Sequence, residues 1–311
     1  MVLVTHSDPS RRPPGRRTLR WIEECCGLGS TVRVLRPLPG GGHVNHAVVV
    51  ETGAGSVRTL VLRRWPRPAD EDAHAIAAEF SPEREIAALT LLAGNGVAAP
   101  PLVAADPSGA YTDAPALLLE RLPGHPPRPT SNDLPVVLIQ TAAALLPIHA
   151  VRGASSMPHY VPRIAAEDAA PPPRATRPDV WERAAEIAAG RAPDAPARFI
   201  HCDYQPDNTL WAFGALSGVV DWSEVSCGPA AVDVAVMRLH LGLRYGLPVA
   251  DHFVEIFDQV SGGYVHDPYW DVRVALDALP CGADVLDEAH VMLHEAFLGA
   301  ALARLGAAAT G

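Results

Sequence analysis

The chain has no lysine, so all 25 of its basic residues are arginine. It also lacks any Cys-x-x-Cys pair among its five cysteines, and its 13 histidines do not have the spacing of a zinc site. An odd number of cysteines without such pairs favours reduced thiols and therefore a cytoplasmic protein. No apolar run reaches the roughly 20 residues of a membrane span, and no apolar core follows the charged N-terminus. We therefore expect neither a membrane partner nor a secretory signal.

The overall composition of the chain indicates a globular protein. The 311 residues are 48% hydrophobic and 19% charged, which is typical of a chain long enough for two lobes with their own cores. The formal net charge of −10 disfavours nucleic acid as a partner. The absence of lysine beside abundant proline and glycine suggests the coding bias of a GC-rich bacterium.

A polar loop, His-Cys-Asp-Tyr-Gln-Pro-Asp-Asn at residues 201–208, lies between two strand-like runs. Pro206 disfavours a helix beyond Asp203, so the Asp203 carboxylate can point at a substrate hydroxyl and accept its proton. The alternative is that these polar residues only bond to the local backbone of a turn.

The residues after this loop predict a hairpin, with strands at 209–213 and 216–222. Such a hairpin would return Asp221 to the neighbourhood of Asn208. Both side chains offer the hard oxygen ligands that Mg²⁺ prefers. A base together with two metal ligands is the set of groups that phosphoryl transfer needs.

The pattern His-x-Asp-x-x-x-x-Asn, followed by a strand that ends in Val-Val-Asp-Trp at residues 219–222, resembles the aminoglycoside phosphotransferase and choline kinase-like family. These enzymes are small-molecule relatives of the protein kinases. The resemblance implies that Asp203 is the catalytic base and that His201 braces the loop. It also implies that Asn208 and Asp221 bind Mg²⁺.

The loop departs from the family's usual residues at three positions. Cys202 and Asp207 stand where the family more often has glycine, and Gln205 stands where it more often has histidine. These departures leave the three chemical positions intact. Further along, Asp233 resembles an aspartate that usually anchors the structure, and we expect His149 to be a packed structural residue.

A glycine-rich turn separates the first two predicted strands. Gly40, Gly41 and Gly42 would let backbone N–H groups come close to a phosphate. No Gly-Lys-Ser/Thr sequence follows, so the turn is not a Walker A loop. A bare hairpin turn is the alternative. The resemblance implies that this turn, with Asn45, covers a nucleotide.

A third strand is predicted at 57–64, where alternation places Arg63 and Val61 on one face. The resemblance implies that Arg63 stands at the place of the kinase lysine that grips the α- and β-phosphates. Glu85, on a helix predicted at 82–93, would face this strand and pair with Arg63. The alternatives are a solvated arginine at the strand end and a surface glutamate in a first helical turn.

The pattern changes from strands to helices after about Pro123. The resemblance makes the preceding segment a hinge, where backbone groups near Glu120 and Leu122 would contact adenine. We expect the first helix after the hinge to be interrupted by Pro147, and residues 153–177 to form an irregular insertion or lid. The predicted organisation is a mobile N-terminus at 1–17, a nucleotide-binding lobe at 18–123, and a helical lobe with the catalytic loop and substrate site at 124–311.

We therefore predict an α+β, protein kinase-like fold of two lobes, an N-terminal antiparallel sheet and an α-helical C-terminal part. The expected cofactors are ATP or GTP and Mg²⁺. The expected reaction transfers the γ-phosphoryl group to a hydroxyl of a small molecule, and the first expected acceptor is an antibiotic of aminoglycoside, macrolide or nucleoside type. A kinase of a metabolic alcohol such as choline or a sugar, and a non-catalytic nucleotide sensor, are the alternatives.

Overall fold

The structure is a computed structural model that describes residues 13–39, 43–65, 82–279 and 287–308. The chain forms two compact units. The first comprises residues 1–123 together with 218–224, and the second comprises residues 124–217 together with 225–311.

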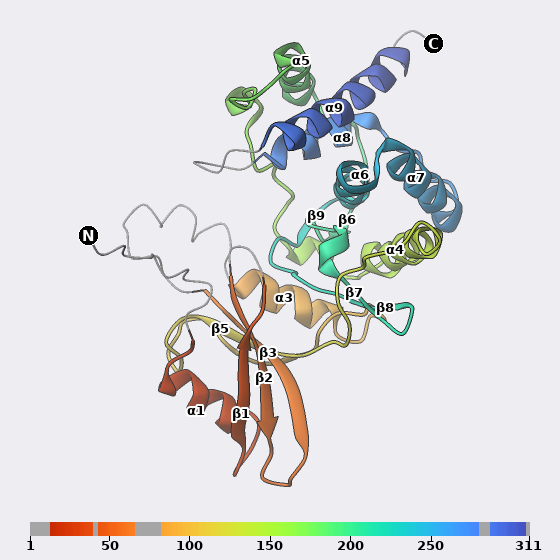
Figure 1. The fold of residues 1–311 in the computed structure, drawn as a ribbon. Coiled ribbons are helices and arrows are strands. Elements are labelled where there is room, and N and C mark those ends of the chain that lie inside the picture. Colours follow the sequence, from red (N-terminus) through yellow and green to blue (C-terminus); the bar gives the residue numbers. More distant parts are fainter. Residues whose placement is uncertain (1–12, 40–42, 66–81, 280–286, 309–311) are drawn as a thin grey trace, which may run out of the picture. The chain divides into compact units, whose positions relative to one another are not determined.

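An antiparallel sheet with the strand order β1-β2-β3-β5-β4 forms the first unit (Figure 1). Its strands are β1 (Thr31–Pro37), β2 (Val44–Glu51), β3 (Val57–Arg64), β4 (Leu102–Asp106) and β5 (Ala116–Glu120). Valine is frequent in β1 to β3, and its branched side chain favours extended backbone. The central pair β2 and β3 runs in register from Val44 opposite Arg64 to Glu51 opposite Val57. This register places Asn45 opposite Arg63.

Two helices of the first unit pack on the sheet from opposite faces. They are α1 (Arg16–Cys25) and α3 (Pro82–Leu92). Trp21 of α1 belongs to a buried cluster with Leu62 of β3. The next residue of β3, Arg63, contacts Glu85 of α3 instead. Because neighbouring side chains of a strand point to opposite faces, Leu62 packs with α1 while Arg63 faces α3.

Helices make up most of the second unit. They are α4 (Leu134–His149), α5 (Pro178–Ala189), α6 (Ala231–Tyr245), α7 (Leu247–Ser261), α8 (Pro268–Asp277) and α9 (Glu288–Ala308). The short strand β6 (Ala197–Ile200) pairs with β9 (Ser226–Pro229), and β7 (Thr209–Ala212) pairs with β8 (Ala215–Val219). The end of β8 leads out of this unit, because residues 218–224 group with the first one.

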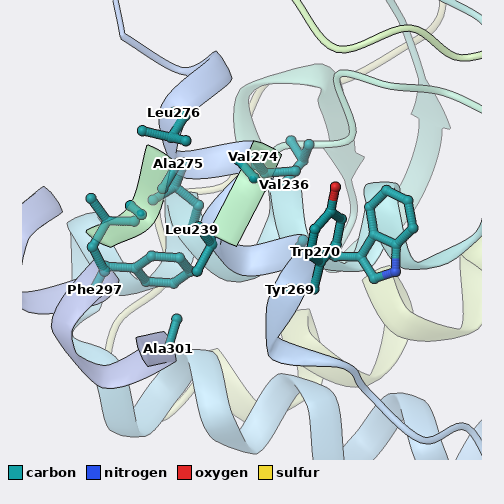
Figure 2. Packing of buried hydrophobic residues seen from close by; sticks show 14 of the residues in the cluster. Val236, Leu239, Tyr269, Trp270, Val274, Ala275, Leu276, Phe297 and Ala301 are labelled. Carbon is teal, nitrogen blue, oxygen red and sulfur yellow. The ribbon is translucent and has the colours of Figure 1, made fainter. Parts of the chain in front are cut away.

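The core of the second unit lies among α5, α6, α8 and α9. Figure 2 shows Phe297 and Ala301 of α9 beside Leu239 of α6. Tyr269 and Trp270 of α8 are buried in the same cluster, with ring centroids 5.1 Å apart. Burial of each large apolar side chain stabilises a fold by about 1.5–3 kcal/mol. This core holds α6, the helix that positions the candidate site.

Two local features differ from the sequence expectations. Helix α4 is not interrupted by Pro147 but continues to His149. The proline lies in the last turn, where it removes one backbone bond shortly before the helix would end in any case. Helix α1 begins at Arg16, before the boundary expected at residue 18 between the N-terminal stretch and the first lobe. The N–H of Gly15 donates to Asp113 Oδ2 at 3.0 Å, which fixes the chain before this helix.

The segment at residues 153–177 contains two short 3₁₀ turns, Ala154–Ser156 and Ala166–Asp168. It is tied to two helices of the second unit. The N–H of Ile164 donates to Asp277 Oδ1 of α8 at 3.0 Å, and the N–H of Thr176 donates to Glu295 Oε1 of α9 at 2.8 Å. The segment is therefore irregular, as expected, but anchored at both of these points.

Candidate active site

The polar loop of residues 201–208 follows strand β6 in the second unit. Within it, the Asp203 carboxylate accepts a hydrogen bond on each oxygen. Gln205 Nε2 lies 2.8 Å from Oδ1, and Asn208 Nδ2 lies 2.6 Å from Oδ2. Pro206 begins a single 3₁₀ turn, η4 (Pro206–Asn208), and this turn brings Asn208 back to Asp203. The carboxylate is therefore held in one orientation by the loop's own amides.

The start of the polar loop is held by Asp233 of α6. Its fully buried carboxylate accepts backbone bonds from His201 at 3.0 Å and Cys202 at 2.8 Å. His149, at the end of α4, places Nε2 2.9 Å from Asp233 Oδ2. The His201 ring also takes part, because its Nδ1 accepts from the Asp203 N–H at 3.2 Å. Two helices thus fix the loop through one buried acid.

Two residues of the candidate site have left-handed backbone, Cys202 with φ 68° and Asp221 with φ 66°. This conformation costs most residues roughly 1–2 kcal/mol, although aspartate tolerates it better than most. Glycine adopts this conformation without that cost, and glycine is the residue that the resembling family more often has at the place of Cys202. The bond from the Cys202 N–H to Asp233 helps to hold the strained residue in place.

Arg63 of β3 joins two carboxylates in the first unit. Its Nε lies 2.9 Å from Glu85 Oε2, and its Nη2 pairs with Asp221 Oδ1. Arg63 and Glu85 are buried, whereas the Asp221 side chain is 32% exposed. The expected pair of Arg63 with Glu85 is confirmed, and Asp221 is a second partner that the sequence did not predict. The planar guanidinium suits this arrangement because it presents donors in several directions at once.

The shared guanidinium sets the charge of this cluster. Burial raises the pKa of Asp221, but the Arg63 guanidinium outweighs that effect and lowers the pKa to about 2. Burial raises the pKa of Glu85 to about 7, although Arg63 acts in the opposite direction. Burial and then Arg63 lower the pKa of His43 to about 4. At neutral pH Asp221 is therefore an anion and His43 is uncharged.

Aromatic and amide side chains surround Arg63. The His43 and Trp65 ring centroids are 4.9 Å apart, and Arg63 Cζ lies 5.6 Å from the Trp65 ring centroid. A guanidinium at this distance from an indole is attracted by its ring electrons. Asn45 Oδ1 is buried, and no group in the described ranges hydrogen-bonds to it. It is therefore a polar atom that a ligand could satisfy.

The remaining nucleotide candidates lie outside this cluster or outside the described residues. Gly40, Gly41 and Gly42 belong to the part that the structure does not describe. Glu120 ends β5, where its carboxylate pairs with Arg58 and its N–H donates to Pro101 O at 2.9 Å. The Leu122 side chain packs against Gly218, where an added Cβ would lie 2.2 Å from Leu122 Cδ1.

The structure thus gathers the predicted residues into two groups. His201, Asp203 and Asn208 meet in the second unit. The first unit contains Asn45 and the cluster of Arg63, Glu85 and Asp221. Ser223 and Gln205 were missed, although both contact the acid two residues before them, at 2.9 Å and 2.8 Å. That spacing is the signal that could have found them, and it also relates Trp65 to Arg63, whereas nothing in the sequence connects His43 with Arg63.

The donor chemistry of Asn208 and Asp221 fits Mg²⁺. Asn208 directs its Nδ2 to Asp203, which leaves Oδ1 as the atom with ligand character. Asp221 stays ionised at neutral pH because of Arg63. Mg²⁺ commonly takes one or two protein oxygens and completes its shell with water and phosphate. The described residues contain no group of three or more His, Cys, Asp or Glu side chains that could hold a metal ion.

A five-stranded antiparallel sheet with a buried basic residue paired to a helix glutamate, and a helical part with an acidic loop, define a kinase-like fold, as predicted. The sequence model of the phosphotransferase enzyme family, APH, matches residues 34–272. The chain therefore belongs to this phosphotransferase family. Among curated protein sequences, none matches the chain.

Solved structures of phosphotransferases share the fold. A thermostable mutant of aminoglycoside phosphotransferase APH(4)-Ia, in ternary complex with AMP-PNP and hygromycin B, has a TM-score of 0.63 at 17% identity, covering 93% of this chain and 98% of its own. Macrolide 2′-phosphotransferase type I has a TM-score of 0.54 at 19% identity, with 98% and 99% covered. Aminoglycoside-3′-phosphotransferase of type VIII has 0.53 at 16%, with 92% and 100% covered. At these identities the likeness concerns the fold.

None of the helices in the described residues is both long enough and apolar enough to cross a bilayer.

Proposed function

We propose that the protein transfers the γ-phosphoryl group of ATP or GTP to a hydroxyl group of a small molecule. The observation that carries the proposal is the setting of Asp203 in a chain of the phosphotransferase family. Each oxygen of its carboxylate is held by an amide of the same loop. A carboxylate of fixed direction is suited to accept the proton of an attacking hydroxyl.

In the proposed reaction, the acceptor hydroxyl binds against Asp203. Its oxygen forms a bond to the γ-phosphorus while the bond from that phosphorus to the bridging oxygen breaks, and the nucleoside diphosphate leaves with the electron pair. Asp203 takes the hydroxyl proton, while His201 and Asp233 keep the loop in place. Mg²⁺, held by Asn208 and Asp221, would neutralise phosphate charge.

We assign nucleotide binding to the first unit. Arg63, fixed by Glu85, would contact the α- and β-phosphates. The turn with Gly40, Gly41 and Gly42 would cover the phosphates together with Asn45, whose buried Oδ1 supports a role in ligand binding. Backbone groups of Glu120 and Leu122 would meet the base.

An antibiotic of aminoglycoside, macrolide or nucleoside type is the acceptor class that we propose. Similar folds occur in phosphotransferases named for aminoglycosides and for macrolides. A metabolic alcohol such as choline or a sugar is the second acceptor class. The altered loop also admits a nucleotide-binding protein without catalysis, and the test below separates this possibility from an enzyme.

The test is release of ADP or GDP, dependent on Mg²⁺, with a panel of aminoglycosides, macrolides, nucleoside antibiotics, sugars and choline. We expect turnover with one acceptor class in the unmodified protein. Asp203→Asn should reduce kcat by roughly 10²- to 10⁴-fold, because the side chain no longer accepts the proton. Asp194→Asn is the matched control, since Asp194 is exposed and contacts only Arg191 among the ion pairs of the described residues.

The outcomes distinguish the alternatives. Turnover that survives in Asp203→Asn within a few-fold would contradict the assignment of the base. Nucleotide binding by calorimetry without turnover across the panel would favour the sensor. Absence of Mg²⁺-dependent nucleotide binding would overturn both.

A further inference from the structure

Gln205 lies in a turn whose backbone bonds do not involve its side chain. The Gln205 N–H donates to Asp203 O at 3.0 Å, and the Asn208 N–H donates to Gln205 O at 3.0 Å. The side chain makes a separate bond, from Nε2 to Asp203 Oδ1 at 2.8 Å. A change at this side chain can therefore remove the contact with the carboxylate while the backbone bonds of the turn remain.

The two side-chain amides that donate to Asp203 differ in the other contacts that they make. Asn208 Nδ2 also donates to the Asp203 carbonyl at 2.9 Å, and Asn208 is a proposed metal ligand. For the Gln205 amide, the described part of the chain offers one side-chain hydrogen bond, the one to Asp203 Oδ1. Gln205 is half-buried, so partial exclusion of water strengthens this bond. Its side chain thus acts on the candidate base alone.

A carboxylate bound through one oxygen can still turn about the bond that joins it to Cβ. The second amide removes that freedom, because Oδ1 and Oδ2 now have separate donors on the same loop. Both donors are neutral, so they direct the lone pairs without placing a full positive charge on the group that must accept a proton.

We propose that Gln205 is a positioning residue, which orients the Asp203 carboxylate toward the acceptor hydroxyl through Oδ1. The inference rests on the proposed function, in which Asp203 is the base. It gives a role to a residue at which this chain departs from the usual residue of the resembling family. A histidine at this position would also offer an N–H donor, so Gln205→His is the conservative replacement.

The kinetic test compares Gln205→Glu with Gln205→His. Glutamate keeps the shape of glutamine but removes the donor, and we expect kcat to fall roughly 10- to 100-fold while KM for the nucleotide changes little, because misorientation affects the reacting geometry. Gln205→His should retain more of kcat than Gln205→Glu. The matched control is Gln259→Glu, since Gln259 is exposed on α7 and should give unmodified kinetics.

A second measurement needs no turnover. The chain has three glutamines, at 140, 205 and 259, so selective ¹⁵N labelling of the glutamine side chain gives three amide nitrogens, each with a pair of N–H signals. The Gln205 signal is identified by its loss in Gln205→Glu. We expect its hydrogens to exchange with water more slowly than those of exposed Gln259. In Asp203→Ala, which removes the acceptor, the Gln205 signal should shift and its exchange should accelerate.

The two measurements separate failure of this inference from failure of the proposed function. An active protein in which Gln205→Glu keeps its full kcat would overturn the positioning role. The contact itself would be overturned, whatever the activity, if the Gln205 amide hydrogens exchanged as fast as those of Gln259 and the Gln205 signal did not change in Asp203→Ala. A slow amide that responds to Asp203→Ala, in a protein without turnover on any acceptor, would retain the contact and reject the enzyme.

Discussion

The two units hold their candidate carboxylates by different means. In the first unit Asp221 is paired with the charged guanidinium of Arg63, which outweighs burial and lowers the pKa of Asp221 to about 2. In the second unit Asp203 is held by the neutral amides of Gln205 and Asn208. A nearby full positive charge favours the ionised form of an acid strongly, whereas neutral donors favour it less and also fix the direction of the carboxylate.

This difference matches the roles that we propose for the two acids. A carboxylate that binds Mg²⁺ has to be ionised, and Arg63 keeps Asp221 ionised at neutral pH before any cation binds. A general base has to accept a proton, and a neighbouring cation would oppose that step. The predictions that follow test the two kinds of control, starting with the largest expected effect.

The second unit should be damaged most by Asp233→Ala. This change leaves the N–H groups of His201 and Cys202 without their buried acceptor. We expect the free energy of unfolding to fall by about 3–5 kcal/mol, because buried groups lose a charged partner. Activity should fall with it, since the loop that carries Asp203 loses its anchor. Urea denaturation followed by tryptophan fluorescence measures the loss. Asp258→Ala, at an exposed site on α7, should change stability by less than about 0.5 kcal/mol.

The charge balance of the first unit should make stability depend on pH through Glu85. Its pKa is raised to about 7 from an ordinary value of 4.5, so the folded state binds more protons than the unfolded state between these values. Stability from this group is present below pH 4.5 and is lost as the pH rises through about 7, by up to about 3 kcal/mol.

The measurement for Glu85 is denaturation at several pH values from 5 to 8. Because Gln cannot titrate, Glu85→Gln should become more stable relative to the unmodified protein as the pH rises. Glu83→Gln, at an exposed position of the same helix, should show no such trend. A difference between Glu85→Gln and the unmodified protein that is the same at every pH would contradict the assignment.

The geometry of the charged partner is tested by Arg63→Lys. Lysine keeps the charge, but its single ammonium group lacks the planar fork that reaches Glu85 and Asp221 from separate nitrogens. We expect nucleotide affinity to fall about tenfold, which is about 1.4 kcal/mol. Calorimetric titration measures it. Arg64→Lys is the control, because Arg64 is equally buried but pairs with Asp113 at 3.0 Å. Equal losses of nucleotide affinity in both variants would contradict a specific role of Arg63, because a buried arginine of β3 with another partner would then affect affinity as much.

The smallest effect is expected at the exposed end of the polar loop. Arg244 of α6 binds Asp207 through both of its terminal nitrogens, at 3.1 Å and 2.7 Å. Both side chains are substantially exposed, so Arg244→Gln should cost only about 0–1 kcal/mol. The cost should shrink further at high salt, which denaturation at two ionic strengths would reveal. A large and salt-independent loss would mean that this pair holds the loop as strongly as Asp233 does.

Strand patterns were the part of the fold most open to prediction. The strand at 57–64 was predicted with its observed bounds, and its alternation placed Arg63 on the face that meets Glu85. Alternation works here because neighbouring side chains of an extended strand point to opposite faces of the sheet, so Leu62 and Arg63 meet different neighbours. The short strand β9 at residues 226–229 was missed, since its sequence Ser-Cys-Gly-Pro has no pattern of its own and it is a strand through its pairing with β6.

The sequence by itself determined the order of chemical groups: a basic residue on a strand, a glutamate on the next helix, and the acids and amide of residues 201–221. This order depends on residue type and on spacing along the chain, and both can be read from local sequence patterns. Tertiary structure alone decided that Asp221 shares Arg63 with Glu85 and that Asp233 bonds to His201 and Cys202. A buried charge needs a partner, but these partners are far apart in the sequence. No local pattern encodes which distant groups meet.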